Sequence, residues 1–270
     1  MNPDPSRVET ASKDEAKTHH DAANLPANPG KTPPEYLRAP DVLLVSYPRS
    51  GNTWMRYLLA NLFFPHKSWN IENISQVIPD LGEDFPKKYL APHPRIFKTH
   101  YPRLTRHRAI YLYRDGRDAA LSYYDRLCKL RADERPFDVF LQEMLLGGCK
   151  FGSWQDHVDS WMSGVESGRV LPVRYESLRL NLEKELLRVG EFLEINWSSL
   201  RIRRAGKQSN RERMRRHLWL YRKQTHWRKG YTGGINREDG YWRQVLSEKQ
   251  RNLFWDYAGD TAARLGYSRR

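Results

Sequence analysis

Cysteine and long hydrophobic runs are scarce in this chain of 270 residues, which has two cysteines. Cys128 and Cys149 lie on stretches that we predict to be helical, without the spacing of metal ligands. They indicate reduced structural side chains in a reducing compartment. No apolar stretch approaches the roughly 20 residues that span a bilayer, and the opening MNPDPSRVET lacks the apolar core of a signal peptide. We therefore expect a soluble cytoplasmic protein without a membrane span.

Acidic side chains are too few to balance the basic ones: 46 Lys and Arg stand against 32 Asp and Glu, for a net charge of +14. This surplus favours an anionic partner, which could be a nucleic acid, a membrane surface or an acidic small molecule. It is concentrated in residues 201–230, where twelve basic side chains occur with one acid, Glu212. A solvated helical face is the alternative explanation of that run.

Large apolar residues are also rare in residues 1–40, which hold seven of the sixteen prolines. Such a segment buries too little surface to offset its ordering entropy, so we predict a mostly disordered tail. Residues 41–270 are long enough for one domain, and hydrophobic periodicity predicts alternating strands and helices there. The predicted strands are 41–47, 95–100, 109–114 and 170–175; the predicted helices are 53–64, 118–129, 136–147, 153–166 and one capped by Asn181.

Short apolar strands that alternate with helices are typical of an α/β fold, here a single domain with a central parallel β-sheet flanked by helices. Ligands in such folds bind at the carboxyl ends of the strands. Three polar motifs of this sequence fall at those ends, so we expect them to form one site.

The first motif, SYPRSGNTW, follows a predicted strand and opens a predicted helix. Backbone N–H groups at a helix N-terminus bind anions, Gly51 permits close backbone approach, and Arg49 adds a charged contact. The Walker pattern G-x-x-x-x-G-K-[ST] is absent, and no acid at a strand end is suited to hold Mg²⁺, which weakens a phosphoryl-transfer interpretation. A plain turn with a helix cap is the structural alternative. The anion-binding residues would be Ser50, Gly51, Asn52 and Thr53.

The second motif, IFKTHYP, ends a strand with Lys98 and His100. A histidine is partly neutral at cytoplasmic pH and can serve as a general base. Lys98 points to the same face of the strand, so both side chains could address one reacting centre. In the third motif, YLYRDGRDAALSYY, Arg114 ends a strand and Ser122 lies two turns into the next helix. These two could hold a second anionic group away from the first.

In this order and spacing, SYPRSGNTW, IFKTH and YLYRDGRDAALSYYDR resemble the cofactor-binding stretches of the PAPS-dependent sulfotransferases, where PAPS is 3′-phosphoadenosine 5′-phosphosulfate. The later WQDHVDSWM, VLPVRYESLRLNLEKELLRVGEFL and RKGYTGG resemble the rest of the family pattern, so the resemblance covers roughly residues 41–267. The cytosolic-type branch is the most similar. The resemblance implies metal-free transfer of a sulfuryl group from PAPS to a hydroxyl or amine of a small acceptor, leaving 3′-phosphoadenosine 5′-phosphate (PAP). A P-loop-like strand–turn–helix would bind the phosphosulfate.

The resemblance also implies a role for each matching residue. His100 would be the general base, Lys98 would stabilise charge on the transferred group, and Arg49 would act beside them. Trp54 would stack on adenine, although a core aromatic at a helix start is the alternative. Arg114 and Ser122 would bind the 3′-phosphate. The implied cofactor-binding residues are Arg49, Ser50, Gly51, Asn52, Thr53, Trp54, Arg114, Ser122, Tyr175, Ser209, Arg228, Lys229 and Gly230.

Some positions depart from the family pattern. Arg49 stands where lysine is usual, and its planar fork differs from a point donor. Asn52 replaces a common Thr or Ser. In KQSNRERMRR, Ser209 matches a residue against the adenine, whereas Arg211 occupies the place of an aromatic. The dimerisation motif of many animal members is not recognisable, so the sequence predicts no oligomeric state. Within the third motif, we expect Arg117 and Asp118 to form structural ion pairs.

Two other function classes stay open. The basic residues 201–230, with Trp219, Tyr221 and Trp227 among them, would suit a nucleic-acid-binding protein. A P-loop-like ATP-dependent kinase is the second alternative. The acceptor is not predicted: a phenol, a sterol-like alcohol, a sugar or a peptide natural product all fit. Aromatic residues suited to an acceptor pocket, or equally to a core, are Trp69, Phe85, Tyr89, Phe137, Phe151, Trp219 and Tyr241.

Overall fold

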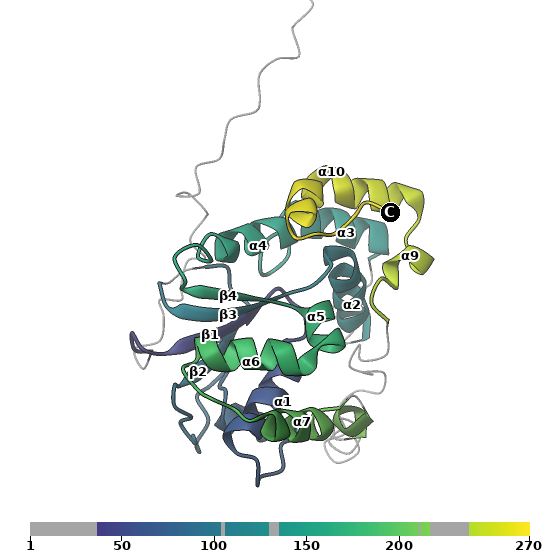
Figure 1. Ribbon diagram of the computed structural model, residues 1–270. Coiled ribbons are helices and arrows are strands. Elements are labelled where there is room, and N and C mark those ends of the chain that lie inside the picture. The colour runs from purple at the N-terminus through teal and green to yellow at the C-terminus, as the bar shows by residue number, and fades with distance from the viewer. Residues whose placement is uncertain (1–36, 104–105, 130–134, 211, 217–237) are drawn as a thin grey trace, which may run out of the picture. The chain divides into compact units, whose positions relative to one another are not determined.

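The computed structural model describes residues 37–103, 106–129, 135–210, 212–216 and 238–270. Its sheet has four parallel strands in the order β2-β1-β3-β4. The strands are β1 (Val42–Ser46), β2 (Ile96–Thr99), β3 (Arg108–Tyr113) and β4 (Val170–Arg174). Their carboxyl ends lie at one edge of the sheet, because all four strands run in the same direction (Figure 1). The predicted α/β fold is confirmed.

Helices follow β1, β3 and β4 along the chain. A single 3₁₀ turn, η1 (Ile74–Gln76), precedes β2, and residues 212–216 are also helical. The α-helices are α1 (Asn52–Phe63), α2 (Gly116–Lys129), α3 (Phe137–Leu145), α4 (Trp154–Met162), α5 (Tyr175–Leu180), α6 (Leu182–Phe192), α7 (Ser199–Gln208), α9 (Trp242–Val245) and α10 (Glu248–Arg264).

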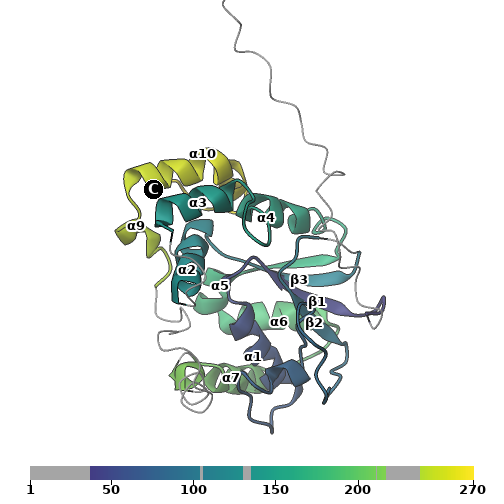
Figure 2. The ribbon, with the colours of Figure 1, turned by 180° about the vertical axis from the view of Figure 1, so that it is seen from behind.

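The two faces of the sheet carry separate hydrophobic cores. Alternate residues of β1 point to opposite faces, so Val42 and Leu44 pack with α1, α6 and α7, whereas Leu43 and Val45 pack with α3, α4 and α10. Figures 1 and 2 show these two groups of helices on opposite sides of the strands. Every residue of β1 is buried, which explains why its first four residues form an unbroken apolar run.

Most predicted elements are present, with boundaries shifted by a few residues. The apolar stripe of α1 is confirmed: its four predicted members, Met55, Leu58, Leu59 and Leu62, are inaccessible to solvent. The cap predicted for α6 is wrong in detail. Asn181 occupies the N-cap position, but its side chain makes no capping bond; its main-chain oxygen accepts the N–H of Glu185 at 3.1 Å.

Among the described residues, the helices α5, α9 and α10 escaped prediction, whereas α7 falls largely within the basic run for which a solvated helical face was the alternative explanation. The start of α10 carried a recognisable signal, because Ser247 and Gln250 form a reciprocal capping box there. Both cysteines are half-buried. No helix in the described part of the chain has the length and apolar character needed to cross a lipid bilayer. The prediction for the tail falls mainly on residues 1–36, which lie outside the described ones.

Candidate active site

The turn between β1 and α1 has the geometry of an anion-binding site. Gly51 is the N-cap of α1 with φ of 98°, and no side chain caps the helix. The first helical hydrogen bond runs from Met55 N to Gly51 O at 3.1 Å, so the N–H groups before it lack intrahelical partners. The helix dipole adds partial positive charge at the same place. A Cβ at position 51 would lie 2.5 Å from Cδ2 of Tyr175, so glycine is required.

Arg49 lies on this turn and reaches across to α2. Its φ is 71°, a left-handed conformation that costs a non-glycine residue roughly 1–2 kcal/mol. Its Nε donates to Oγ of Ser122 at 3.0 Å. The structure therefore brings together two residues that we had assigned to separate anionic groups.

Ser50 and Asn52 face the protein interior. Ser50 is fully buried, and its Oγ has no hydrogen-bond partner among the described residues. Asn52 donates from Nδ2 to Oγ of Ser46 at 3.3 Å and to the oxygen of Leu44 at 3.4 Å. Asn52 thus holds the turn against β1, whereas Thr53 is exposed.

Tyr175, the first residue of α5, is the centre of an aromatic cluster. Its ring meets the edge of Trp54 with centroids 5.9 Å apart and an interplanar angle of 75°. The guanidinium of Arg114 lies over the same ring, 4.7 Å from its centroid. Trp54 is half-buried and packs against the hydrophobic core on the face of the sheet that α1, α6 and α7 cover. One part of its surface is therefore covered by protein and another is accessible.

Arg114 sits between acidic residues. One of its terminal nitrogens is 3.6 Å from Asp118 and 3.9 Å from Asp239, yet its buried Nε has no partner among the described residues. Asp118 also accepts the N–H groups of Gly240 at 2.7 Å and Trp242 at 3.0 Å. Burial raises the pKa of Asp118, and the Arg114 charge opposes that effect.

The ion pairs predicted for the third motif are present. Arg117 binds the carboxylate of Asp115 through Nε at 2.9 Å and through a terminal nitrogen at 2.8 Å. Asp118 pairs with Arg114, as described above. These contacts keep both residues in structural roles beside the site.

His100 has a defined tautomer. Its Nδ1 lies 2.7 Å from the main-chain oxygen of Ser46, so Nδ1 carries the proton and donates it, leaving Nε2 as the basic nitrogen of a neutral ring. Burial lowers the pKa of His100 to about 3, and the Lys98 charge acts in the same direction. The ring of Phe151 meets the imidazole edge-on, with centroids 5.5 Å apart.

Two residues that sequence reasoning missed support the second motif. His157 on α4 donates from Nε2 to the main-chain oxygen of His100 at 3.1 Å. Asp80 forms an ion pair with Lys98. Neither residue belongs to the motif, and only WQDHVDSWM, which contains His157, carried a sequence signal.

The structure does not bring all predicted residues to this edge. Ser209 is fully buried and accepts a hydrogen bond from Nδ2 of Asn61 at 3.1 Å. Asn61 lies nine residues beyond Asn52, which places it roughly 13 Å along α1. Arg228, Lys229 and Gly230 lie outside the described residues, as do Arg211, Trp219, Tyr221 and Trp227.

The aromatic residues suggested for an acceptor pocket separate into groups. Trp69 is buried in the hydrophobic core on the face of the sheet that α1, α6 and α7 cover. Phe85 and Tyr89 contact each other with centroids 5.1 Å apart. Phe151 is the one of these aromatics whose described contacts include the ring of His100.

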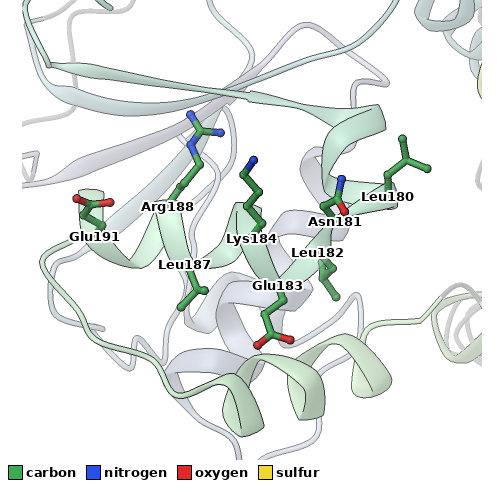
Figure 3. Close-up of a pocket in the computed structure, with 8 residues that line it drawn as sticks. All are labelled: Leu180, Asn181, Leu182, Glu183, Lys184, Leu187, Arg188 and Glu191. Carbon is green, nitrogen blue, oxygen red and sulfur yellow. The ribbon is translucent and has the colours of Figure 1, made fainter.

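A cavity of about 690 Å³ lies elsewhere, along α6 (Figure 3). Lys184 and Arg188 extend from one side of the helix, whereas Glu183 and Leu187 extend from the other. Its polar groups therefore do not converge, and none of its lining residues belongs to the three motifs. Across the described ranges, no group of three or more His, Cys, Asp or Glu residues is placed to hold a metal ion.

The sequence of this chain is similar to those of known sulfotransferases. Residues 39–266 match the model of the sulfotransferase domain. Mouse sulfotransferase 1B1 is 31% identical over 179 residues, which cover 57% of this chain and 58% of that protein. Rat sulfotransferase 1E1 is 30% identical over 179 residues, covering 58% of this chain and 60% of that protein. The matched region therefore spans less than two thirds of each relative.

Solved structures show the same fold. A retinol dehydratase in complex with retinol and PAP superposes with a TM-score of 0.68 at 19% identity, covering 84% of this chain and 82% of that one. The mouse sulfotransferase SULT7A1 complexed with PAP superposes with a TM-score of 0.63 at 22% identity, covering 85% and 89%. At these identities the likeness establishes the fold.

Proposed function

This chain belongs to the sulfotransferase domain family, and we propose that it transfers a sulfuryl group from PAPS to a hydroxyl or amine of a small acceptor, releasing PAP. The observation that carries this proposal is the meeting of three features at one sheet edge. They are the uncapped glycine turn before α1, the Tyr175 cluster and the neutral imidazole of His100. We assign the activity to the domain formed by residues 41–270.

The residues of the site fit an anionic nucleotide. Ser50 Oγ and Arg114 Nε are buried without protein partners in the described residues, and such groups normally have one. The turn N–H groups, Ser50 and Arg49 would hold the phosphosulfate. The 3′-phosphate would meet Arg114 and Ser122.

Adenine would lie against Trp54 and Tyr175. Their rings form an edge-to-face pair, and Tyr175 also covers Gly51. Trp54 is half-buried, so part of its side chain remains accessible to a planar base. Asn52 would act indirectly, by holding the turn against β1 through Ser46.

His100 is suited to take the proton of the acceptor. Because Nδ1–H donates to Ser46, the lone pair of Nε2 is available to the acceptor hydroxyl as its oxygen attacks sulfur. PAPS, when bound, supplies the sulfuryl group and a phosphate leaving group. Arg49 and Lys98 would stabilise the negative charge that develops on the transferred group.

Radiolabelled PAPS provides the direct test. Incubation with phenols, alcohols, sugars and peptides should label at least one acceptor, and isothermal titration should show PAP binding. Failure of both measurements would overturn the proposal. Magnesium-dependent ATP turnover without PAP binding would instead support the kinase alternative, and salt-dependent binding of generic DNA or RNA would support the nucleic-acid alternative. The cytoplasmic location stays a prediction.

A further inference from the structure

Lys98 is held by a buried ion pair at the end of β2. Its Nζ contacts Oδ2 of Asp80, and the two side chains are only 13% and 11% exposed. The other carboxylate oxygen, Oδ1, accepts the N–H of Gly82 at 3.0 Å. Both oxygens of Asp80 therefore have protein partners, which leaves Asp80 poorly suited to bind an amine of the acceptor.

The main chain brings Asp80 to this position. Residues 79–81 run parallel to β2, with Asp80 and Lys98 as bridge partners. The N–H of Lys98 donates to the oxygen of Pro79 at 2.7 Å, and the N–H of Leu81 donates to the oxygen of Lys98 at 2.9 Å. Lys98 is thus held at both main-chain groups and at its ammonium by three consecutive residues.

The same segment is tied to α1, the helix that begins at the anion-binding turn. Arg56 of α1 donates from Nη2 to the oxygen of Ile78 at 2.7 Å and to Oγ of Ser75 at 3.0 Å. A short series of contacts therefore links α1 to the ammonium of Lys98 through Ile78 and Asp80. Such a link fixes the lysine relative to the turn.

We propose that Asp80 is a positioning residue for the transfer reaction. Its carboxylate holds the protonated ammonium of Lys98 at the carboxyl end of β2, beside His100. The inference rests on the proposed function, because the role of Lys98 at the transferred group is part of it. A buried ion pair alone contributes little net stability compared with an apolar pair. Its placement next to the general base is what gives this pair a catalytic use.

The charges around Lys98 predict a pH signature. Burial lowers the pKa of Lys98 and the Asp80 carboxylate opposes that effect, while Arg56 lowers it and Glu83 raises it. Burial likewise raises the pKa of Asp80, but Lys98 holds it below its usual value. Removing the charge of Asp80 should therefore lower the pKa of Lys98 further, so that the ammonium deprotonates at lower pH.

The test compares Asp80→Asn with Asp84→Asn, the same chemical change at an exposed position four residues away. Asparagine keeps an oxygen for Gly82 while it removes the charge that faces Lys98. We expect kcat for labelled PAPS and 4-nitrophenol to fall roughly tenfold or more, because misplacement of a group by about 1 Å can cost 10²-fold. The alkaline limb of the kcat profile should move down by roughly 1–3 pH units. The dissociation constant of PAP should change less than about twofold, and Asp84→Asn should match the wild type.

A double variant separates positioning from general damage. If Asp80 acts through Lys98, adding Asp80→Asn to Lys98→Met should lower kcat no further. Independent, additive losses would overturn the proposal, as would an Asp80→Asn enzyme with wild-type kcat and alkaline limb. Circular dichroism melts accompany each variant, and Asp80→Ser replaces Asp80→Asn, with the same expectations, if the asparagine variant does not fold.

The wild-type measurements keep the two hypotheses distinguishable. A wild-type protein that neither binds PAP nor turns over any acceptor overturns the proposed function, and the role of Asp80 with it. A wild-type protein that turns over another acceptor of the panel is tested with that acceptor in place of 4-nitrophenol. An active wild type with an unaltered Asp80→Asn variant overturns the role of Asp80 alone.

Discussion

His157 supports the main chain of His100 from the neighbouring helix. Its Nε2 donates to the oxygen of His100 at 3.1 Å, and its Nδ1 accepts the hydroxyl proton of Tyr111 at 3.0 Å. Both ring nitrogens are thus engaged, and the general base predicted from one motif depends on a histidine 57 residues further along the chain.

Replacement of His157 should reduce catalysis without changing cofactor affinity. His157→Ala would leave the oxygen of His100 without its donor, which costs about 1–3 kcal/mol, in addition to the cavity that it creates. We expect a lower melting temperature and a lower kcat with an unchanged dissociation constant for PAP. His66→Ala, at an exposed histidine, is the control. Unchanged kcat and stability in His157→Ala would contradict the supporting role.

Stability should decrease as the pH falls from about 6.5 toward 4. Burial lowers the pKa of His157 to about 4 and that of His100 to about 3, below the unfolded value near 6.5. Between these values the unfolded chain binds more protons than the folded one, so the free energy of unfolding falls by up to about 1.4 kcal/mol per pH unit for each histidine. Urea titrations at several pH values should show this loss, and His157→Gln should reduce it. A curve with no slope in this range would contradict burial of the neutral rings.

His100→Ala should abolish sulfuryl transfer while PAP binding persists. Ser46 positions the imidazole and His157 supports the main chain of His100, whereas the cofactor residues lie on other elements, so the two functions separate. Because the pKa of His100 is already low in the enzyme without ligands, kcat/KM of the wild type should stay level down to roughly pH 5. Isothermal titration and initial rates measure the two quantities. Full activity in His100→Ala would remove the general-base assignment.

Gly51→Ala should weaken PAP binding through Tyr175. The new Cβ would lie 2.5 Å from the ring, and φ of 98° adds backbone strain. Gly168→Ala is the matched control, because Gly168 also has positive φ, 67°, but nothing lies within 4 Å of its Cβ position. We expect a loss of PAP affinity of tenfold or more, about 1.4 kcal/mol, only at position 51. Equal affinities in the two variants would argue against the Tyr175 contact.

Ser122→Ala should weaken PAP more than 5′-AMP, which lacks the 3′-phosphate. The hydroxyl of Ser122 is buried and already binds Nε of Arg49, so the variant removes a contact that the ligand would share. We expect a several-fold increase in the dissociation constant for PAP, of about 1 kcal/mol. Competition binding with both nucleotides gives the ratio. An equal loss for both would place Ser122 away from the 3′-phosphate.

Local patterns were sufficient for much of the fold. Apolar periodicity identified β1 and the α1 stripe, since burial on a strand or a helix face follows from spacing along the chain. The glycine and small polar residues between strand and helix located the turn at Gly51, where the structure has φ of 98°. Local patterns did not predict contacts that cross the structure, such as the hydrogen bond from Asn61 to Ser209.

The sequence by itself determined the four strands, the helix that opens at the glycine turn, the three polar motifs at strand ends and the family resemblance, because strands, helices and motifs are patterns of residues close together in the chain. Only the tertiary structure decided which distant groups meet. Arg49 reaches Ser122, Tyr175 covers Gly51, and Asp80 binds Lys98. The physical reason is that these contacts form when parallel strands bring their carboxyl ends to one edge, and residue spacing does not encode which side chains then come within hydrogen-bonding distance.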